Sequence, residues 1–209
     1  MTRSAEFVHK FVPGRDAKAP VLLLLHGTGG NEGDLIDLGH QLLPTAALIS
    51  PRGKVLENGM PRFFKRLAEG VFDLVDLKHR TKELAEFISF SRVEYGFEGS
   101  NVIAVGYSNG ANIAASLLLS QPEPLSGGVL FRPMVPFLPE TLPNLDGTPV
   151  FLGAGKRDPI VPPGNTLELA TMFEQARADV FLHWHHGGHQ LGLDDIESAR
   201  KWLVDKGKI

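Results

Sequence analysis

Residues 102–119 read VIAVGYSNGANIAASLLL, which is an apolar run, a glycine-flanked serine and a run of small and apolar residues. The apolar start predicts a buried strand, and Ala111–Leu119 predicts a helix that follows it after a sharp turn. Gly106 and Gly110 suit such a turn, because the neighbouring main chain leaves no room for a Cβ. Ser108 then presents its Oγ at the tip. The alternative is a tight turn that only packs the helix on the strand.

Short apolar runs followed by turn residues recur along the chain, and most are continuously apolar rather than alternating. They lie at Val21–Leu25, Ala46–Ile49, Val102–Tyr107, Gly128–Phe131, Val150–Leu152 and Val180–Trp184. Strands that are buried on both faces have this pattern. Stretches with a helical apolar repeat, such as Leu74–Ile88 and Ile196–Leu203, lie between some of them. The alternation predicts an α/β fold with a mostly parallel central sheet and helices on both faces, in which functional residues follow strands.

The composition limits the classes of function. The chain has 209 residues, of which 43% are apolar, with a net charge of −3 and no cysteine. These values predict one domain over residues 1–209 without disulfides or a thiol nucleophile. No basic field is available to attract nucleic acid or a membrane surface. Residues 1–11 lack the apolar run of a signal peptide, and no run is long enough to span a bilayer, so we expect a cytoplasmic protein.

Two stretches, Pro51–Phe72 and Arg132–Thr148, are rich in Pro, Gly and aromatic residues and interrupt the alternation. We expect them to be loops that cover a site. Four of their apolar side chains either line an acyl pocket or belong to the core: Phe63, Phe64, Met134 and Phe137. Three basic side chains either select an acidic or polar acyl group or form a solvated face: Arg62, Lys65 and Arg66.

A glycine-rich turn follows the predicted strand Val21–Leu25, in the sequence His26-Gly27-Thr28-Gly29-Gly30. Its glycines allow the backbone to approach a ligand closely. The amide of Thr28 is therefore expected to form an oxyanion hole together with the amide of Asn109, which begins the helix after the serine. His26 is expected to brace the loop through hydrogen bonds. The G-x-G-x-x-G spacing of dinucleotide sites is absent, so no cofactor is expected.

A serine hydroxyl needs a neutral imidazole as base, and the imidazole needs an acceptor that fixes its tautomer. Asp158 lies in a turn just after the predicted strand Val150–Leu152, at the edge of the sheet where Ser108 is expected. Asp146 and Asp179 precede strands and therefore lie at the opposite edge. His189 follows the strand Val180–Trp184 and two glycines, which suits a base that reaches toward the serine.

The segment around His189 holds four histidines within seven residues, at positions 183, 185, 186 and 189. Neutral imidazole is a common zinc ligand, so a metal site is an alternative. However, H-E-x-x-H is absent and residues on one strand and its turn do not easily surround one ion. No metal is expected. His183 and His185 share one face of a strand and are expected to be packing or surface residues.

Together these motifs resemble the phospholipase/carboxylesterase branch of the α/β-hydrolases, close to the acyl-protein thioesterases, over essentially the whole chain. The resemblance is carried by His26-Gly27-Thr28-Gly29-Gly30-Asn31-Glu32 with Asp34-Leu35, Gly106-Tyr107-Ser108-Asn109-Gly110-Ala111, Asp158-Pro159-Ile160-Val161-Pro162 and Gly188-His189. It implies Ser108 as nucleophile, His189 as base and Asp158 as the acid that orients the base. It also implies the amides of Thr28 and Asn109 as oxyanion donors.

Two departures affect the expected substrate. Acyl-protein thioesterases usually have glutamine after the nucleophile, where this chain has Asn109. The segment Arg62-Phe63-Phe64-Lys65-Arg66 also differs from their usual aromatic segment and looks more like that of small bacterial esterases in the same branch. The expected activity is therefore hydrolysis of carboxylic esters with small or medium acyl groups, through an acyl-enzyme.

Other functions stay open on the sequence alone. A thioesterase or a lysophospholipase of the same fold would use the same residues, and a ligand-binding protein can keep the fold without turnover. The expected partner is a small-molecule ester, with no nucleic acid and no membrane. The sequence also leaves a homodimer open.

Overall fold

A computed structural model describes residues 6–120 and 125–206 of the chain. Its centre is a seven-stranded sheet in the order β1-β3-β2-β8-β9-β10-β11. The strands are β1 (His9–Val12), β2 (Val21–Leu25), β3 (Leu48–Pro51), β8 (Val102–Tyr107), β9 (Gly127–Phe131), β10 (Pro149–Gly155) and β11 (Asp179–His185). Only β1 runs antiparallel to its neighbour, β3, and all other adjacent pairs are parallel. The predicted α/β fold with a mostly parallel sheet is confirmed.

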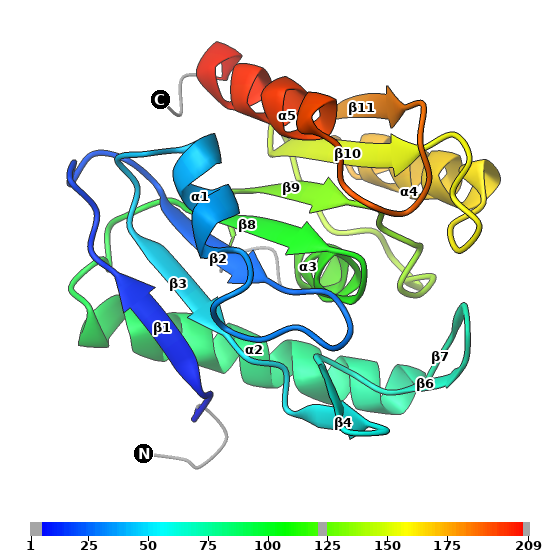
Figure 1. The fold of residues 1–209 in the computed structure, drawn as a ribbon, viewed down its shortest axis with the longest axis horizontal. Helices are drawn as coiled ribbons and strands as arrows, with labels where there is room; N and C mark the ends of the chain where they lie inside the picture. Colours follow the sequence, from blue (N-terminus) through cyan, green and yellow to red (C-terminus); the bar gives the residue numbers. More distant parts are fainter. Residues whose placement is uncertain (1–5, 121–124, 207–209) are drawn as a thin grey trace.

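Helices cover both faces of this sheet (Figure 1). They are α1 (Ile36–Leu42), α2 (Leu74–Glu94), α3 (Asn109–Ser120), α4 (Pro163–Gln175) and α5 (Leu193–Asp205). Successive side chains of a strand point to opposite faces. Leu22 and Leu24 therefore pack in the core under α1 and α5, whereas Leu23 and Leu25 pack in the second core under α2, α3 and α4. The continuous apolar run of β2 serves both cores at once.

Four short strands lie within the stretch 51–72, which the sequence predicts to be a loop. They form two antiparallel hairpins, one of β4 (Val55–Glu57) with β5 (Met60–Arg62) and one of β6 (Arg66–Ala68) with β7 (Val71–Phe72). Strands of two or three residues are too short to produce a detectable apolar pattern. The stretch 132–148 contains neither helix nor strand, so there the loop prediction agrees with the structure.

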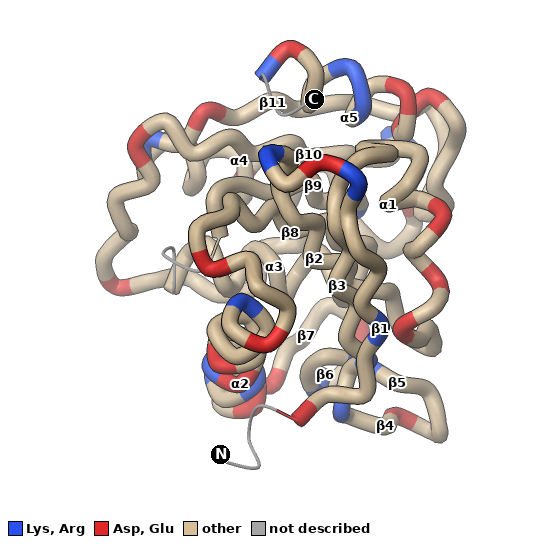
Figure 2. The backbone as a smooth tube through the Cα atoms, turned by 90° about the vertical axis from the view of Figure 1, so that its left-hand side faces the viewer, with Lys and Arg blue, Asp and Glu red and all other residues tan. Residues whose placement is uncertain are grey.

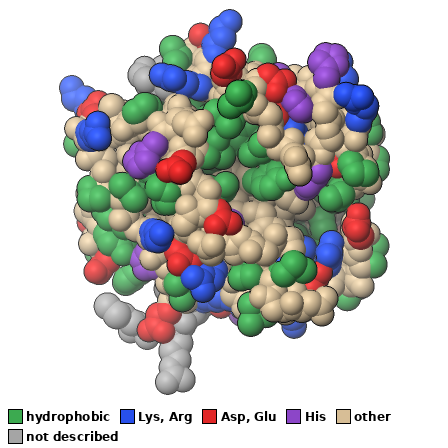
Figure 3. Space-filling view, viewed as in Figure 1, with side chains coloured by type: hydrophobic (Ala, Val, Ile, Leu, Met, Phe, Trp, Pro, Cys, Tyr) green, Lys and Arg blue, Asp and Glu red, His purple; other side chains and the backbone are tan. Residues whose placement is uncertain are grey.

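Charged residues of both signs alternate along the chain (Figure 2), and on the face drawn in Figure 3 basic and acidic side chains are interspersed. Along α2, Arg80 bonds both Asp76 and Glu83, which are its neighbours on one face of the helix. Among the residues that the structure describes, no helix has the length and apolarity needed to cross a membrane.

The parallel strands end at the same edge of the sheet, where the arrowheads of β2, β8, β9, β10 and β11 point in Figure 1. The register pairs Leu25 with Gly106 across β2 and β8, and Gly155 with His185 across β10 and β11. Loops that are far apart in the sequence therefore meet at this edge.

Candidate active site

Ser108 occupies the sharp turn between β8 and α3, and its backbone is in the left-handed region at φ 52°. A serine rarely adopts this conformation, so the surrounding structure must hold it. The flanking glycines allow the close approach that the turn needs. A Cβ on Gly110 would lie 1.9 Å from the carbonyl oxygen of Leu25, and one on Gly106 would lie 2.6 Å from that of Gly110. Both positions therefore require glycine, as the sequence predicts.

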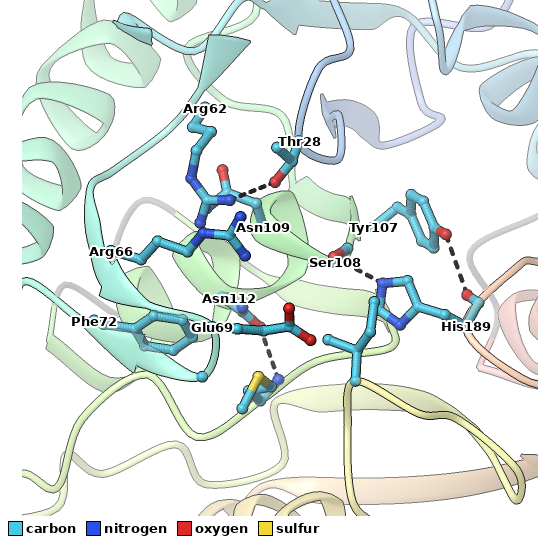
Figure 4. Close-up of a pocket in the computed structure, with 13 residues that line it drawn as sticks. Thr28, Arg62, Arg66, Glu69, Phe72, Tyr107, Ser108, Asn109, Asn112 and His189 are labelled. Atoms are coloured by element: carbon cyan, nitrogen blue, oxygen red, sulfur yellow. Dashed lines mark hydrogen bonds between the residues drawn. The ribbon is translucent and has the colours of Figure 1, made fainter. Parts of the chain in front are cut away.

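Ser108, His189 and Asp158 form a chain of hydrogen bonds, part of which is drawn in Figure 4. The Nε2 of His189 lies 2.9 Å from the Oγ of Ser108, and its Nδ1 lies 2.8 Å from the Oδ2 of Asp158. Both distances are within hydrogen-bond range. The three predicted residues come from the loops after β8, β10 and β11, and the structure brings them together.

The carboxylate of Asp158 is fixed on both of its oxygens. Its side chain is fully buried, and Oδ1 accepts hydrogen bonds from the backbone N–H groups of Ile160 and Val161 at 2.8 and 3.0 Å. The other oxygen therefore stays directed at His189. An acceptor at Nδ1 sets the tautomer in which Nε2 is free to take a proton from a hydroxyl.

The amides of Thr28 and Asn109 belong to residues that line the same cavity as Ser108. Neither amide has a hydrogen-bond acceptor among the parts of the chain that the structure describes.

The buried ring of His26 supports the loop that contains Thr28: its Nδ1 bonds the carbonyl of Gly27 at 2.6 Å, and its Nε2 accepts from the amide of Gly53 at 3.0 Å. Burial lowers the pKa of His26 below its ordinary value. Its ring thus braces the loop in the neutral form.

Two contacts that sequence reasoning missed connect the end of β5 to the expected oxyanion residues. Arg62 donates from Nη1 to the Oγ1 of Thr28 at 2.6 Å, and the amide of Phe63 donates to the Oδ1 of Asn109 at 2.7 Å. The Nδ2 of Asn109 is buried without a hydrogen-bond partner in the described structure. No sequence motif marks these contacts, because the residues of the first pair are 34 positions apart in the chain and those of the second pair are 46 positions apart.

A cavity of about 320 Å³ opens beside Ser108 and His189. It is lined also by Thr28, Arg62, Arg66, Glu69, Gly70, Phe72, Tyr107, Asn109, Asn112, Met134 and Ile160. Met134, which the sequence left open between an acyl pocket and the core, lies in this lining. Its amide donates to the Oδ1 of Asn112, which lies one turn into α3.

The other three aromatic side chains that the sequence offered for an acyl pocket do not line this cavity. Phe63 and Phe64 are at most 2% exposed and belong to the core, and Phe137 packs against the same core. The expectation that these three side chains line an acyl pocket is therefore wrong, because their rings pack into or against the apolar core rather than facing the cavity. Phe72, which the sequence analysis did not single out, lines the cavity instead.

The three basic residues of the 62–66 segment have different environments. Arg62 is only 3% exposed and lines the cavity, so it is not a solvated charge. Burial, together with the positive charge of Arg66, lowers its pKa. Arg66 also lines the cavity and binds the carboxylate of Glu57 through two nitrogens. Lys65 is exposed and takes no part in the lining.

His183 and His185 of the same segment have separate partners, and His186 is exposed. His183 stacks on the ring of Phe151, and the Nε2 of His185 lies 3.1 Å from the carboxylate of Asp194. His185, Asp194 and Asp195 place ligand atoms within 4.8 Å of one another. Asp195, however, is already bound on both oxygens, by Arg132 and by the amide of Gly192. This cluster is therefore accounted for by internal bonds.

Comparisons with known proteins identify the family of the chain. The family model described as Phospholipase/Carboxylesterase matches residues 8–205. The chain is 53% identical to the putative hydrolase MhqD of Bacillus subtilis (strain 168) over 185 residues, which is 88% of this chain and 92% of that protein.

Solved structures are similar as well. The carboxylesterase of Bacillus cereus has a TM-score of 0.94 at 51% identity, with coverage of 96% of this chain and 95% of that one. The structure of YahD with malic acid has a TM-score of 0.89 at 31% identity, with coverage of 96% and 99%. The chain belongs to the phospholipase/carboxylesterase family of serine hydrolases, within the α/β-hydrolase fold.

Proposed function

We propose that this enzyme hydrolyses small carboxylic esters, with Ser108 as nucleophile, His189 as general base and Asp158 as the acid that orients the base. The observation that carries the proposal is the continuous hydrogen-bond chain of 2.9 and 2.8 Å through the ring of His189. A base within hydrogen-bond reach of the hydroxyl, itself oriented by a carboxylate, is the arrangement that activates a serine.

The reaction has two halves. The Oγ of Ser108 attacks the ester carbonyl carbon while its proton passes to the Nε2 of His189, and the carbonyl oxygen becomes an oxyanion. The free amides of Thr28 and Asn109 stabilise that charge. When the carbon–oxygen bond of the ester breaks, His189 returns the proton to the leaving alcohol. Water then attacks the acyl-enzyme by the same route, which releases the acid and restores the serine.

The lining of the cavity favours short and polar acyl groups. Arg62, Arg66 and Glu69 contribute charged side chains to it, and a long alkyl chain would have to displace water from them without replacing their hydrogen bonds. The similar protein YahD was solved with malic acid, a small polar acid, which is in keeping with this preference.

Two assays test the proposal. A fluorophosphonate probe should label the wild-type enzyme and fail to label Ser108→Ala. Circular dichroism is used to show that both proteins are folded. Absence of labelling in the folded wild type would contradict the serine mechanism and favour a ligand-binding role. In the second assay, p-nitrophenyl esters of increasing chain length are compared with acyl-CoA thioesters and a lysophospholipid. We expect kcat/KM to be highest for short esters; a maximum at long chains or at thioesters would contradict the substrate class.

A further inference from the structure

Three consecutive backbone carbonyls around His189 are each held by a side chain from a neighbouring strand end. Arg132 donates from Nε to the carbonyl of Gly188 at 3.1 Å and from Nη2 to that of Gln190 at 2.9 Å. The hydroxyl of Tyr107 donates to the carbonyl of His189 itself at 3.1 Å. Residues 186–192 contain neither helix nor strand, so these side chains supply hydrogen bonds that regular structure does not.

Arg132 is itself fixed from several sides. It follows β9 directly, in the left-handed backbone region at φ 56°, and its amide donates to the carbonyl of Gly153 at 2.7 Å. Its side chain is fully buried and forms a two-pronged ion pair with the equally buried Asp195, at 3.0 and 2.6 Å. Asp195 lies in the first turn of α5 and also accepts the amide of Gly192. The guanidinium thus connects β9, α5 and the loop between β11 and α5.

These hydrogen bonds require the planar guanidinium group of an arginine. Two nitrogens bind the carboxylate while Nε and Nη2 reach carbonyls on either side of His189. A lysine ammonium has one nitrogen on a flexible stem and cannot reproduce bonds in several fixed directions. Arg132 does not line the cavity beside Ser108, whereas Tyr107 does. Any effect of Arg132 on turnover must therefore pass through the loop that carries His189.

From these contacts we infer that Arg132, held by Asp195, is a positioning residue for the base His189. The inference rests on the proposed function, in which the imidazole must lie within proton-transfer distance of Ser108. The bonds on both sides of residue 189 fix the backbone from which the imidazole projects. Asp158 fixes the orientation of the imidazole ring, and Arg132 fixes the position of the backbone that carries it.

The chain offers a matched control. Arg157 also donates from Nε to a carbonyl of this loop, that of His186 at 2.8 Å, but its side chain is exposed and its acceptor lies three residues before His189. Arg132→Lys and Arg157→Lys are therefore compared with the wild type for kcat and KM on p-nitrophenyl acetate and for thermal unfolding. A displacement of a catalytic group by about 1 Å can reduce turnover by about 100-fold. We expect kcat to fall by about 10- to 100-fold in Arg132→Lys, with KM within about twofold, and neither to change in Arg157→Lys.

A spectroscopic measurement separates positioning from general loss of stability. The low-field proton signal of the His189 Nδ1–H, assigned by its absence in His189→Ala, should be sharp in the wild type and broadened or lost in Arg132→Lys, at a temperature where both proteins are folded. Asp195→Asn, which removes the charge that holds the guanidinium, should show the same signature with a smaller fall in kcat.

Three outcomes are decisive. If kcat and the proton signal of Arg132→Lys match those of Arg157→Lys, the inference is wrong. If KM rises as much as kcat falls, Arg132 acts on substrate binding, and the inference is also wrong. If the wild type is not labelled by the fluorophosphonate probe, the proposed function fails first, so the two failures are distinguishable.

Discussion

The side-chain oxygen of Asn109 accepts a hydrogen bond from the backbone amide of Phe63 at 2.7 Å, and both residues are buried. This bond joins the first residue of α3, next to the proposed nucleophile, to the segment that follows β5. The same segment carries Arg62 into the cavity. Asn109 therefore holds the segment after β5 through its side chain, and its backbone amide is the proposed oxyanion donor.

Asn109→Ala should leave the amide of Phe63 buried without an acceptor. An unsatisfied buried donor costs about 1–3 kcal/mol, so we expect the free energy of unfolding in urea to fall by that amount. The control is Asn101→Ala, which removes an acceptor for the hydroxyl of Ser126 at 3.1 Å in an exposed setting. It should change stability by less than about 0.5 kcal/mol. Equal effects of the two substitutions would contradict the role given to Asn109.

Asp158→Asn should preserve the fold and nearly abolish turnover. An amide oxygen can still accept from Ile160 and Val161, but the side chain no longer favours the tautomer that leaves Nε2 of His189 free to take a proton. We expect kcat on p-nitrophenyl acetate to drop by about 10⁴-fold. Asp146→Asn, at an exposed residue paired with Arg177, should leave kcat unchanged. Retention of more than a tenth of the activity in Asp158→Asn would argue against the assignment.

Gly110→Ala should prevent normal folding of the turn, because its Cβ would lie 1.9 Å from the carbonyl oxygen of Leu25. Backbone on both sides has to move, and we expect a loss of at least about 3 kcal/mol in the free energy of unfolding or an insoluble product. Gly164→Ala is the control, since a Cβ there meets no atom within 4 Å and the residue lies in the first turn of α4. It should be neutral or stabilising by up to about 1 kcal/mol.

The buried histidine of the glycine-rich loop should make stability depend on pH. Burial lowers the pKa of His26 in the folded state below its value in the unfolded chain, so protonation favours unfolding. Its contribution is complete above the unfolded pKa of about 6.5 and is lost as the pH falls toward the folded pKa. We therefore expect the stability advantage of the wild type over His26→Gln, from urea unfolding, to shrink between pH 7.5 and 5.5. A constant difference across that range would show that His26 does not titrate as described.

Predictions from the sequence were most accurate where one local pattern determines the structure. The apolar runs of β2 and β8, the glycines of the Ser108 turn and the positions of Asp158 and His189 after strands can all be predicted, because each depends on neighbouring residues. The strand expected at Ala46–Ile49 is displaced to Leu48–Pro51, since an apolar run does not fix where pairing begins and ends.

Contacts between distant segments escaped prediction. The edge strand β1 has exposed and half-buried residues and no continuous apolar run, and α1 and α4 were not singled out at all. The inward turn of Phe63 and Phe64 depends on the β4–β5 hairpin, which no short pattern indicates. Arg132 directly follows the fully buried strand β9, but Lys156 follows the fully buried strand β10 in the same way and is exposed, so position after a strand did not single out Arg132.

The loop of His189 follows β11, which is the edge strand of the sheet and pairs only with β10. The turn of the proposed nucleophile is held where β2, β8 and β9 meet, since the amide of Ser108 donates to the carbonyl of Phe131 at 2.9 Å, but Ser108 has no base until β11 has also docked. Recovery of esterase activity after dilution from urea should therefore lag behind the recovery of secondary structure. A chromogenic ester thus reports on the docking of β11 during refolding.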